Sequence, residues 1–235
     1  DVERSRGLGD VYKRQSIGVE PLVISRGYGR KSSGFLEVNI MGLKQQFGDE
    51  PLMIKQRFPQ IKVWVCESRL EAVKKAENLS DKPGILLFDD AFQHRKIKPH
   101  FSLVLSKAAN PFYKDYLLPM GALREGRKGV NRASMICYTK LNDFAQCEAL
   151  RKGFNSSIPQ VCAKYEYADL ILKKGETSPS KGDDIVLITA LAKSTEVEDE
   201  LKKDYNLVHH FKYRDHFQFE EKHVLSWLAK LNFLS

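Results

Sequence analysis

The 235-residue chain has no apolar run that approaches the length of a membrane-spanning helix, which needs about 20 residues. No secretory signal is visible either. The cysteines contain no CxxC pair, and no Cys/His cluster has the spacing of zinc ligands, so a zinc site is disfavoured. We expect all four cysteines to be buried free thiols of a protein in a reducing compartment, namely Cys66, Cys137, Cys147 and Cys162.

The composition is that of a globular protein, with 42% hydrophobic and 29% charged residues. The formal net charge is +8. Such an excess fits an ordinary solvated surface, or it indicates an anionic partner such as a nucleotide, a phosphorylated lipid, a membrane surface or nucleic acid. The chain has no repeat of basic and aromatic residues that favours nucleic acid.

Residues 1–15 (DVERSRGLGDVYKRQ) are polar, have no clear period and resemble translated linker sequence. We therefore expect a foreign or disordered segment there, with the true N-terminus lost. A core is expected over residues 16–164 and a smaller lobe over residues 165–235. Within that lobe, residues 173–184 are rich in Gly, Pro and Ser and are the best candidate for a linker.

Apolar strand-like runs alternate with amphipathic helices along the core. Strands are expected at 21–25, 61–66, 85–88, 101–105 and 133–138, and helices at 49–57, 68–79 and around 144–154. The second lobe repeats this alternation, with strands at 185–189 and 207–211, a helix at 197–204 and a closing helix. The predicted fold is α/β: a parallel sheet flanked by helices, with a smaller C-terminal α/β lobe.

The strongest chemical pattern is the run ILLF at 85–88 followed by Asp89 and Asp90. It has the form of a Walker-B strand, whose carboxylates hold Mg²⁺. A turn or a helix cap built from Asp90 is the plainer alternative. Asp49 opens the expected helix at 49–57. In the next expected helix, at 68–79, Leu70, Val73 and Ala76 lie on one apolar face. By itself, Asp49 is better explained as an N-cap than as a metal ligand or a base.

Two further clusters suit phosphate binding. The loop LLPMGALRE at 117–125 carries Arg124, whose planar guanidinium fits a phosphate, although a surface salt bridge explains it equally well. Ligands of open parallel sheets bind beyond the carboxyl ends of the strands. There, Gly27 and Gly29 allow close backbone approach, and Arg26 adds charge. No GxxxxGK(S/T) loop occurs anywhere in the chain.

A neighbouring acid and imidazole, Asp215 and His216, occur in the second lobe. Such a pair can tune the imidazole near neutral pH, although a lone histidine is usually structural. His209 and His210 lie on an alternating strand and are expected to be ordinary strand residues.

Five segments in order resemble the tetraacyldisaccharide 4'-kinase family: VISRGYGR at 23–30, GDEP at 48–51, DDAFQHR at 89–95, LLPMGALRE at 117–125, and Asp215-His216. The resemblance implies a P-loop-kinase-like sheet and transfer of the γ-phosphate of ATP to the 4'-hydroxyl of tetraacyldisaccharide 1-phosphate. The product is lipid IVA, in lipid A biosynthesis. It also implies a peripheral enzyme at the cytoplasmic face of the bacterial inner membrane, with no nucleic-acid partner.

The resemblance assigns roles by position. Asp49 and His216 become the catalytic pair, and Arg124 stabilises charge on the transferring phosphoryl group. The remaining family positions are the nucleotide-binding Arg26, Gly27 and Gly29 and the Mg²⁺-binding Asp89, Asp90 and Glu125.

The sequence departs from the family pattern in two places. The Walker A loop should precede Val23, where the foreign-looking stretch lies, so we expect weak ATP binding and little kinase activity from this chain. An in-frame GxxxxGK(S/T) upstream of codon 16 would restore a complete kinase. Residues 189–193 (TALAK) resemble a degraded TGIANP stretch.

Two other functions stay open. Another magnesium-nucleotide protein, either a different P-loop kinase or a GTPase, would tolerate loss of His216. A non-catalytic basic module that binds anionic membrane or nucleic acid would not respond to loss of Asp89, and its binding would fall steeply with salt.

Overall fold

A computed structural model describes residues 19–166, 179–191, 193–215, 217 and 219–231. The chain divides into two compact units, Asp1–Glu166 and Tyr167–Ser235. This division lies close to the expected start of the second lobe at residue 165. The foreign-looking segment 1–15 and the linker residues up to 178 lie outside the described residues.

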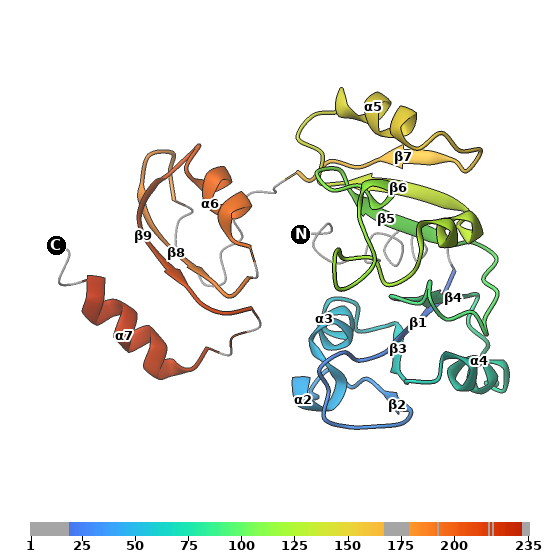
Figure 1. Cartoon of the computed structure of the whole chain (residues 1–235). Helices are drawn as coiled ribbons and strands as arrows, with labels where there is room; N and C mark the ends of the chain where they lie inside the picture. Colours follow the sequence, from blue (N-terminus) through green and yellow to red (C-terminus); the bar gives the residue numbers. More distant parts are fainter. Residues whose placement is uncertain (1–18, 167–178, 192, 216, 218, 232–235) are drawn as a thin grey trace. The chain divides into compact units, whose positions relative to one another are not determined.

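The first unit contains a four-stranded sheet in the order β2-β3-β1-β4 (Figure 1). The strands β1 (Pro21–Ser25), β3 (Lys62–Val65) and β4 (Ile85–Phe88) are parallel. Short β2 (Leu36–Glu37) pairs antiparallel with β3. Every residue of β1 is buried, as a central strand covered on both faces requires. Because the three long strands are parallel, their carboxyl ends share one edge of the sheet.

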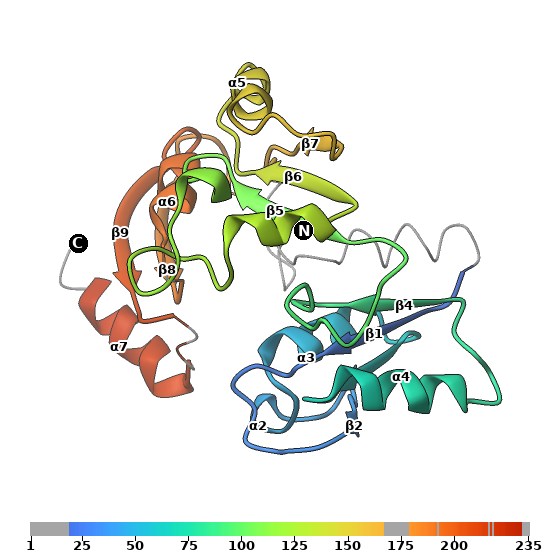
Figure 2. The ribbon, with the colours of Figure 1, turned by 45° about the vertical axis from the view of Figure 1, so that its right-hand side comes forward.

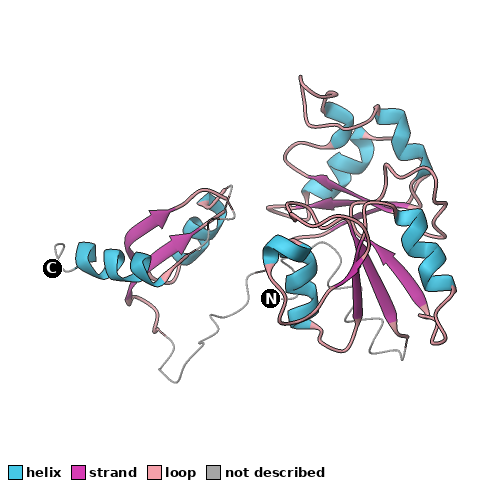
Figure 3. Ribbon diagram, turned by 90° about the horizontal axis from the view of Figure 1, so that it is seen from below, coloured by secondary structure: helices cyan, strands magenta, loops and turns pink. Residues whose placement is uncertain are grey.

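Helices cover both faces of this sheet, and the alternation of side chains along β1 shows how. Val23 packs in one cluster with Leu52 and Ile54 of α3 (Asp49–Arg57). Its neighbours along the strand, Leu22 and Ile24, pack in a second cluster with alanines of α4 (Arg69–Glu77). The helices therefore lie on opposite sides of the strands (Figure 3). Short α2 (Lys44–Phe47) directly precedes α3.

The predicted inner face of α4 is partly wrong. Leu70 was expected to be buried but is 40% exposed. The buried residues are Arg69, Ala72 and Ala76. The small alanines let the helix lie close to the sheet, and the buried arginine takes a polar role at the strand ends. Ser68 is the N-cap, and its hydroxyl accepts a bond from the Glu71 amide at 3.3 Å.

The first unit also contains a three-stranded parallel sheet, β5-β6-β7. Its strands are β5 (Leu103–Lys107), β6 (Met135–Thr139) and β7 (Gln160–Cys162), so the first two begin later than expected. The helix α5 (Gln146–Gly153) lies beside β7 (Figure 1). Two 3-10 segments, η1 (Phe112–Lys114) and η2 (Arg127–Arg132), flank the loop that carries Arg124.

The prediction of four free thiols is wrong for one pair, because Cys147 and Cys162 form a disulfide. One lies in α5 and the other ends β7, with Cα atoms 6.1 Å apart, a normal separation for a disulfide. The free, buried state expected of Cys66 and Cys137 is confirmed. Burial raises the pKa of both thiols, which keeps them protonated and unreactive.

The second unit pairs β8 (Asp184–Thr189) and β9 (Asn206–Lys212) in parallel, with α6 (Thr195–Leu201) between them in sequence. The closing helix α7 (Glu221–Leu231) runs beside β9 (Figure 2). Its Trp227 indole donates a 2.7 Å hydrogen bond to the Tyr213 hydroxyl. Val224 and Leu228, on the expected apolar face with Leu231, remain exposed. Across the described ranges, no helix is both long and apolar enough to span a membrane.

Candidate functional site

The candidate site lies at the carboxyl edge of the β2-β3-β1-β4 sheet. Three chain segments leave the sheet there: Arg26–Gly27 after β1, Cys66–Ser68 after β3, and Asp89–Asp90 after β4. Sequence patterns predicted the first and third of these segments as functional. The structure shows what joins them.

A buried arginine ties together the segments that follow β3 and β4, the two strands that flank β1. Arg69 is 1% exposed. Its guanidinium donates to the Cys66 carbonyl at 2.8 Å and to the Asp89 carbonyl at 3.2 Å. Burial lowers the pKa of Arg69, and the nearby Asp89 carboxylate opposes that change. Arg69 therefore positions the turn that carries both aspartates, and sequence analysis did not identify it.

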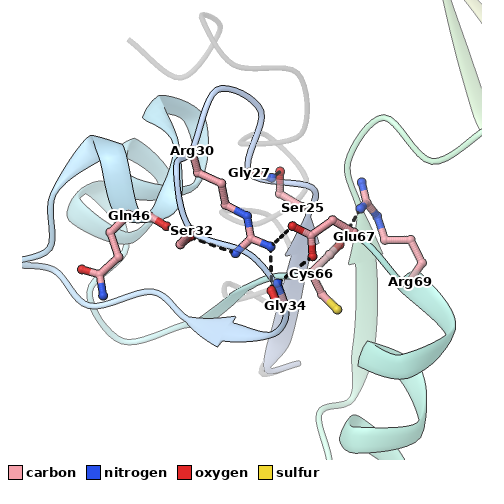
Figure 4. Close-up of polar contacts among 9 residues, drawn as sticks. All are labelled: Ser25, Gly27, Arg30, Ser32, Gly34, Gln46, Cys66, Glu67 and Arg69. Carbon is pink, nitrogen blue, oxygen red and sulfur yellow. Dashed lines mark hydrogen bonds and ion pairs between the residues drawn. The ribbon is translucent and has the colours of Figure 1, made fainter.

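The loop after β1 is closed by polar contacts (Figure 4). The Gly27 amide donates to the Ser25 hydroxyl at 3.3 Å. The buried Arg30 side chain bonds the Gly34 carbonyl at 2.6 Å and forms an ion pair with Glu67 at 2.5 Å. Glu67 in turn accepts from the Gly34 amide at 3.0 Å. The loop is thus tied to the segment after β3.

Those contacts also set the charge of Glu67. Partial burial pushes its pKa upward, but hydrogen bonds from its own backbone amide, from Arg30 and from Gly34 hold the pKa below its usual range. Glu67 consequently stays ionised as the partner of Arg30, and the loop keeps its shape. Arg30, which belongs to one of the segments shared with the family, therefore has a structural role in this loop.

The same loop packs against the start of α3. Gly48 adopts φ +90°, and a Cβ there would lie 2.9 Å from the Tyr28 carbonyl oxygen, so only glycine fits. Gly48 is the N-cap residue, and Asp49 is the first residue of the helix. The prediction of Asp49 as the N-cap is therefore wrong. Its carboxylate lies 3.3 Å from the Lys44 ammonium and remains at the helix N-terminus.

Asp90 and Arg124 meet although 34 residues separate them in sequence. The Arg124 guanidinium donates to the Asp90 carboxylate at 2.6 Å. Asp90 has φ 46°, a left-handed conformation that turns the chain sharply after β4. The bond to Asp90 raises the pKa of Arg124, and Tyr28 adds to this through its charge interaction. Loops that follow different strands therefore converge at this edge.

Glu125 is held by arginines. Its carboxylate accepts from Arg132 at 2.9 Å and 3.0 Å and from Arg95 at 3.3 Å. The bond from Arg132 is the main cause that lowers the pKa of Glu125. Within the described residues, no three His, Cys, Asp or Glu side chains are grouped as metal ligands. Asp89, Asp90 and Glu125 thus do not form a ready three-ligand metal cage.

His94, in the turn after Asp90, lies in a positive environment. Desolvation is the largest cause that lowers its pKa, and the charges of Arg69 and Arg26 lower it further, while Asp90 acts in the opposite sense. These charges and the burial of the ring favour the neutral form of the imidazole.

The two histidine predictions in the second unit have different outcomes. His216 lies outside the described residues, so its pairing with Asp49 stays a prediction. His210 lies in β9 as expected, but it is more than an ordinary strand residue. Its ring nitrogens lie 2.9 Å from the Glu198 carboxylate and 2.9 Å from the Thr189 hydroxyl, joining α6, β8 and β9.

Comparison with known proteins gives a consistent set of relatives. The family model described as "Tetraacyldisaccharide-1-P 4'-kinase" matches residues 11–232. A tetraacyldisaccharide 4'-kinase of Flavobacterium psychrophilum is 35% identical over 86% of this chain and 61% of that protein. One from Cytophaga hutchinsonii is 29% identical over 89% of this chain and 61% of that protein.

A solved structure agrees with the sequence relatives. The crystal structure of LpxK from Aquifex aeolicus in complex with ATP has a TM-score of 0.68 and 26% identity, covering 91% of this chain and 69% of that one. This likeness confirms the predicted P-loop-kinase-like α/β fold. The chain spans about three fifths of the length of the curated relatives, at 61% of each of the two named above. The protein belongs to the tetraacyldisaccharide-1-P 4'-kinase family.

Proposed function

We propose that this protein transfers the γ-phosphate of ATP to the 4'-hydroxyl of tetraacyldisaccharide 1-phosphate, forming lipid IVA. One observation carries the proposal: the candidate base and the candidate metal ligands lie on loops at the carboxyl edge of one sheet. Gly48, beside Asp49, packs against the loop after β1. Asp89 and Asp90 follow β4, the parallel neighbour of β1, and Asp90 is bonded to Arg124 at 2.6 Å.

Asp49 is the proposed catalytic base. It is the first residue of α3, and its carboxylate lies 3.3 Å from the Lys44 ammonium. The carboxylate accepts the proton of the sugar hydroxyl, or aligns the hydroxyl for in-line attack on the γ-phosphate. We assign His216, which lies outside the described residues, as the second member of the proposed catalytic pair.

The arginines and glycines of the edge suit the triphosphate. Arg124 is exposed and needs only to exchange Asp90 for a phosphoryl oxygen, where its fixed positive charge offsets charge that develops in the transition state. Arg26 adds a second positive charge. Gly27 and Gly29 both have positive φ, which favours glycine. The Gly27 amide is bonded to Ser25, and the open space at Gly29 allows close approach of a phosphate.

The residues at this edge fit a magnesium ion. Mg²⁺ is usually held by one or two carboxylates, with waters and substrate phosphates completing the shell, so a three-carboxylate cage is not required. Asp89 and Asp90 supply oxygen ligands directly after a strand. When bound, the ion would neutralise charge on the β- and γ-phosphates. Glu125 supports the site by positioning Arg95 and Arg132, to which it is bonded.

We place the enzyme peripherally at the cytoplasmic face of the bacterial inner membrane. The acceptor is an acylated, anionic lipid, and the chain carries a formal charge of +8. Such a charge draws a protein towards an anionic leaflet.

The test is transfer of labelled γ-phosphate to tetraacyldisaccharide 1-phosphate. The 235 residues contain no GxxxxGK(S/T) sequence, so the assay uses residues 16–235 preceded by the phosphate-binding loop of a relative. We expect the chain with the added phosphate-binding loop to form product. Asp49→Asn in that chain should lower kcat by at least about 100-fold, the scale of a lost general base.

The control variant is Asp143→Asn, which removes an exposed carboxylate far along the chain and should keep full activity. Circular dichroism verifies that each variant is folded. Equal activity of Asp49→Asn and Asp143→Asn would remove Asp49 from the mechanism. A folded chain with the restored loop that gives no product would overturn the kinase proposal.

A further inference from the structure

The loop that precedes Arg124 displays large apolar side chains to solvent. Tyr116 is 58% exposed, Leu117 50%, Leu118 63% and Met120 81%. Four such residues lie within five positions, and exposed apolar side chains gathered in one segment are typical of an interaction site. We call residues 116–123 the apolar loop. None of the contacts proposed for ATP, Mg²⁺ or the sugar hydroxyl uses these side chains.

The exposure is built into the loop by its backbone. The Asp115 carboxylate accepts from the Tyr116 amide at 2.8 Å and from the Ala122 amide at 3.3 Å. The Leu118 amide donates to the Leu123 carbonyl, and the Leu123 amide to the Tyr116 carbonyl, each at 3.0 Å. The loop is therefore closed at its base, and the apolar side chains project from it.

Glycine makes this closure possible. A Cβ at Gly121 would lie 2.3 Å from both the Asp115 carboxylate and the Tyr116 carbonyl oxygen, so a side chain cannot fit there. The apolar tip is thus held in one shape by polar contacts, and its exposure is a feature of the ordered fold.

Basic residues flank the apolar loop in sequence, and one of them contacts its base. The Arg127 guanidinium donates to the Asp115 carbonyl at 2.9 Å and 2.7 Å and lies over the Tyr116 ring, 5.2 Å from its centroid. Lys114, Arg124 and Lys128 are exposed nearby in sequence. An apolar tip with basic residues on both sides of it in the chain is complementary to an anionic lipid surface, where hydrocarbon lies beneath negative headgroups.

We propose that the apolar loop inserts Leu117, Leu118 and Met120 into the hydrocarbon boundary of an anionic bilayer, with Arg127, Lys114 and Lys128 at the headgroups. This deepens the proposed function and rests on it for the reason to reach a membrane. Arg124 directly follows the apolar loop and contacts Asp90. Docking by the loop therefore brings the carboxyl edge of the sheet to the depth where a lipid's sugar headgroup lies.

The test is co-sedimentation of the full 235-residue chain with vesicles, without nucleotide. The vesicles are either phosphatidylcholine alone or a mixture with phosphatidylglycerol. We expect binding to the anionic vesicles that falls as salt is raised. The double variant Leu118→Gln/Met120→Gln should bind at least about tenfold more weakly, because two apolar side chains no longer leave water.

The matched control is Leu70→Gln/Phe144→Gln, which removes two apolar side chains that are 40% and 57% exposed elsewhere in the first unit. Its binding should stay within about twofold of the parent. Insertion is read separately with Leu118→Trp and Phe144→Trp, using lipids brominated on their acyl chains. The parent chain, which contains Trp64 and Trp227, gives the background quenching. Only the Leu118→Trp variant should be quenched more strongly than this background.

Three outcomes would overturn the proposal: no binding of the parent chain to anionic vesicles, equal binding by the two double variants, or no quenching at position 118. Equal vesicle binding with a lower unfolding temperature for Leu118→Gln/Met120→Gln would show that the loop packs on protein instead. Failure of phosphate transfer with vesicle binding intact would reject the kinase proposal and leave the docking proposal standing.

Discussion

Two clusters of bonded charges in this protein look alike in composition and differ in exposure. At the carboxyl edge of the first unit, Asp90 and Arg124 bond each other with both side chains 59% exposed. In the second unit, Glu198 bonds Lys202, Lys212 and His210 with its own side chain 17% exposed and that of His210 7% exposed.

The difference in exposure distinguishes the Asp90–Arg124 pair, which belongs to the proposed reaction site, from the Glu198 cluster, which has a structural role. The first pair joins loops and can exchange partners with a ligand at little cost, since an exposed ion pair contributes only about 0–1 kcal/mol to stability. The second cluster joins a helix and two strands, and the side chains of Glu198 and His210 within it are largely shielded from solvent. Variants of the first cluster should therefore affect chemistry, and variants of the second should affect folding.

The largest expected effect is that of Asp90→Asn on phosphate transfer. In the chain with a restored phosphate-binding loop, we expect kcat/KM to fall by at least about 100-fold, the scale of lost electrostatic stabilisation of phosphoryl transfer. The free energy of unfolding should change by less than about 1 kcal/mol. Urea denaturation and initial rates measure the two quantities. A large loss of stability with little loss of rate would reverse the comparison.

Arg69→Met should lower both kcat/KM and the free energy of unfolding, because Arg69 is buried and also lies at the carboxyl edge of the sheet. Loss of its bonds leaves the Cys66 and Asp89 carbonyls without that partner, so we expect the free energy of unfolding to fall by about 2–4 kcal/mol. Urea denaturation is the measurement. Arg151→Met serves as the control, since Arg151 is exposed in the last turn of α5. Equal stability of the two variants would remove the role assigned to Arg69.

Gly48→Ala tests the contact between the start of α3 and the loop after β1. An alanine at φ +90° is strained, and its Cβ would meet the Tyr28 carbonyl at 2.9 Å. We expect a loss of about 1–3 kcal/mol in the free energy of unfolding, with a reduced rate because Asp49 shifts. Gly126→Ala is the matched control, because a Cβ there has open space. Unchanged activity in Gly48→Ala would show that Asp49 needs no such placement.

The smallest expected effect is a pH dependence in the second unit. Hydrogen bonds from Lys202, Lys212 and His210 lower the pKa of Glu198 to about 2. A depressed carboxyl pKa stabilises the fold above the unfolded value and loses that contribution as pH falls through the folded value. The urea midpoint of the parent should thus fall between about pH 5 and pH 2 by more than that of Glu198→Gln. Parallel pH profiles of the two proteins would contradict the assignment.

Local patterns were sufficient to predict much of the fold. Apolar runs located β1 and β4 with their observed bounds, and the sequence Asp-Glu-Pro located the start of α3. The paired aspartates after β4 were singled out because the apolar run before them has the form of a Walker-B strand. These features depend on residues that are neighbours in sequence.

The features missed depend on residues far apart. Nothing local distinguishes Arg69, which is buried against two strand ends, from an exposed arginine in a first helical turn. Cys147 and Cys162 are 15 residues apart and become neighbours only when α5 packs beside β7. The arginine partners of Glu125 are likewise set by the meeting of loops. Local sequence patterns were sufficient to predict which chemical groups lie at the carboxyl edge of the sheet. Their bonding partners depend on how the loops pack.

The most direct test of the central comparison is a side-by-side measurement of kcat/KM for Asp49→Asn and Glu198→Gln. Both change one carboxylate to an amide in the chain with a restored phosphate-binding loop. The comparison predicts a loss of at least about 100-fold for Asp49→Asn and less than about threefold for Glu198→Gln at pH 7. Similar losses in the two variants would contradict the claim that the carboxyl edge of the first sheet carries the chemistry.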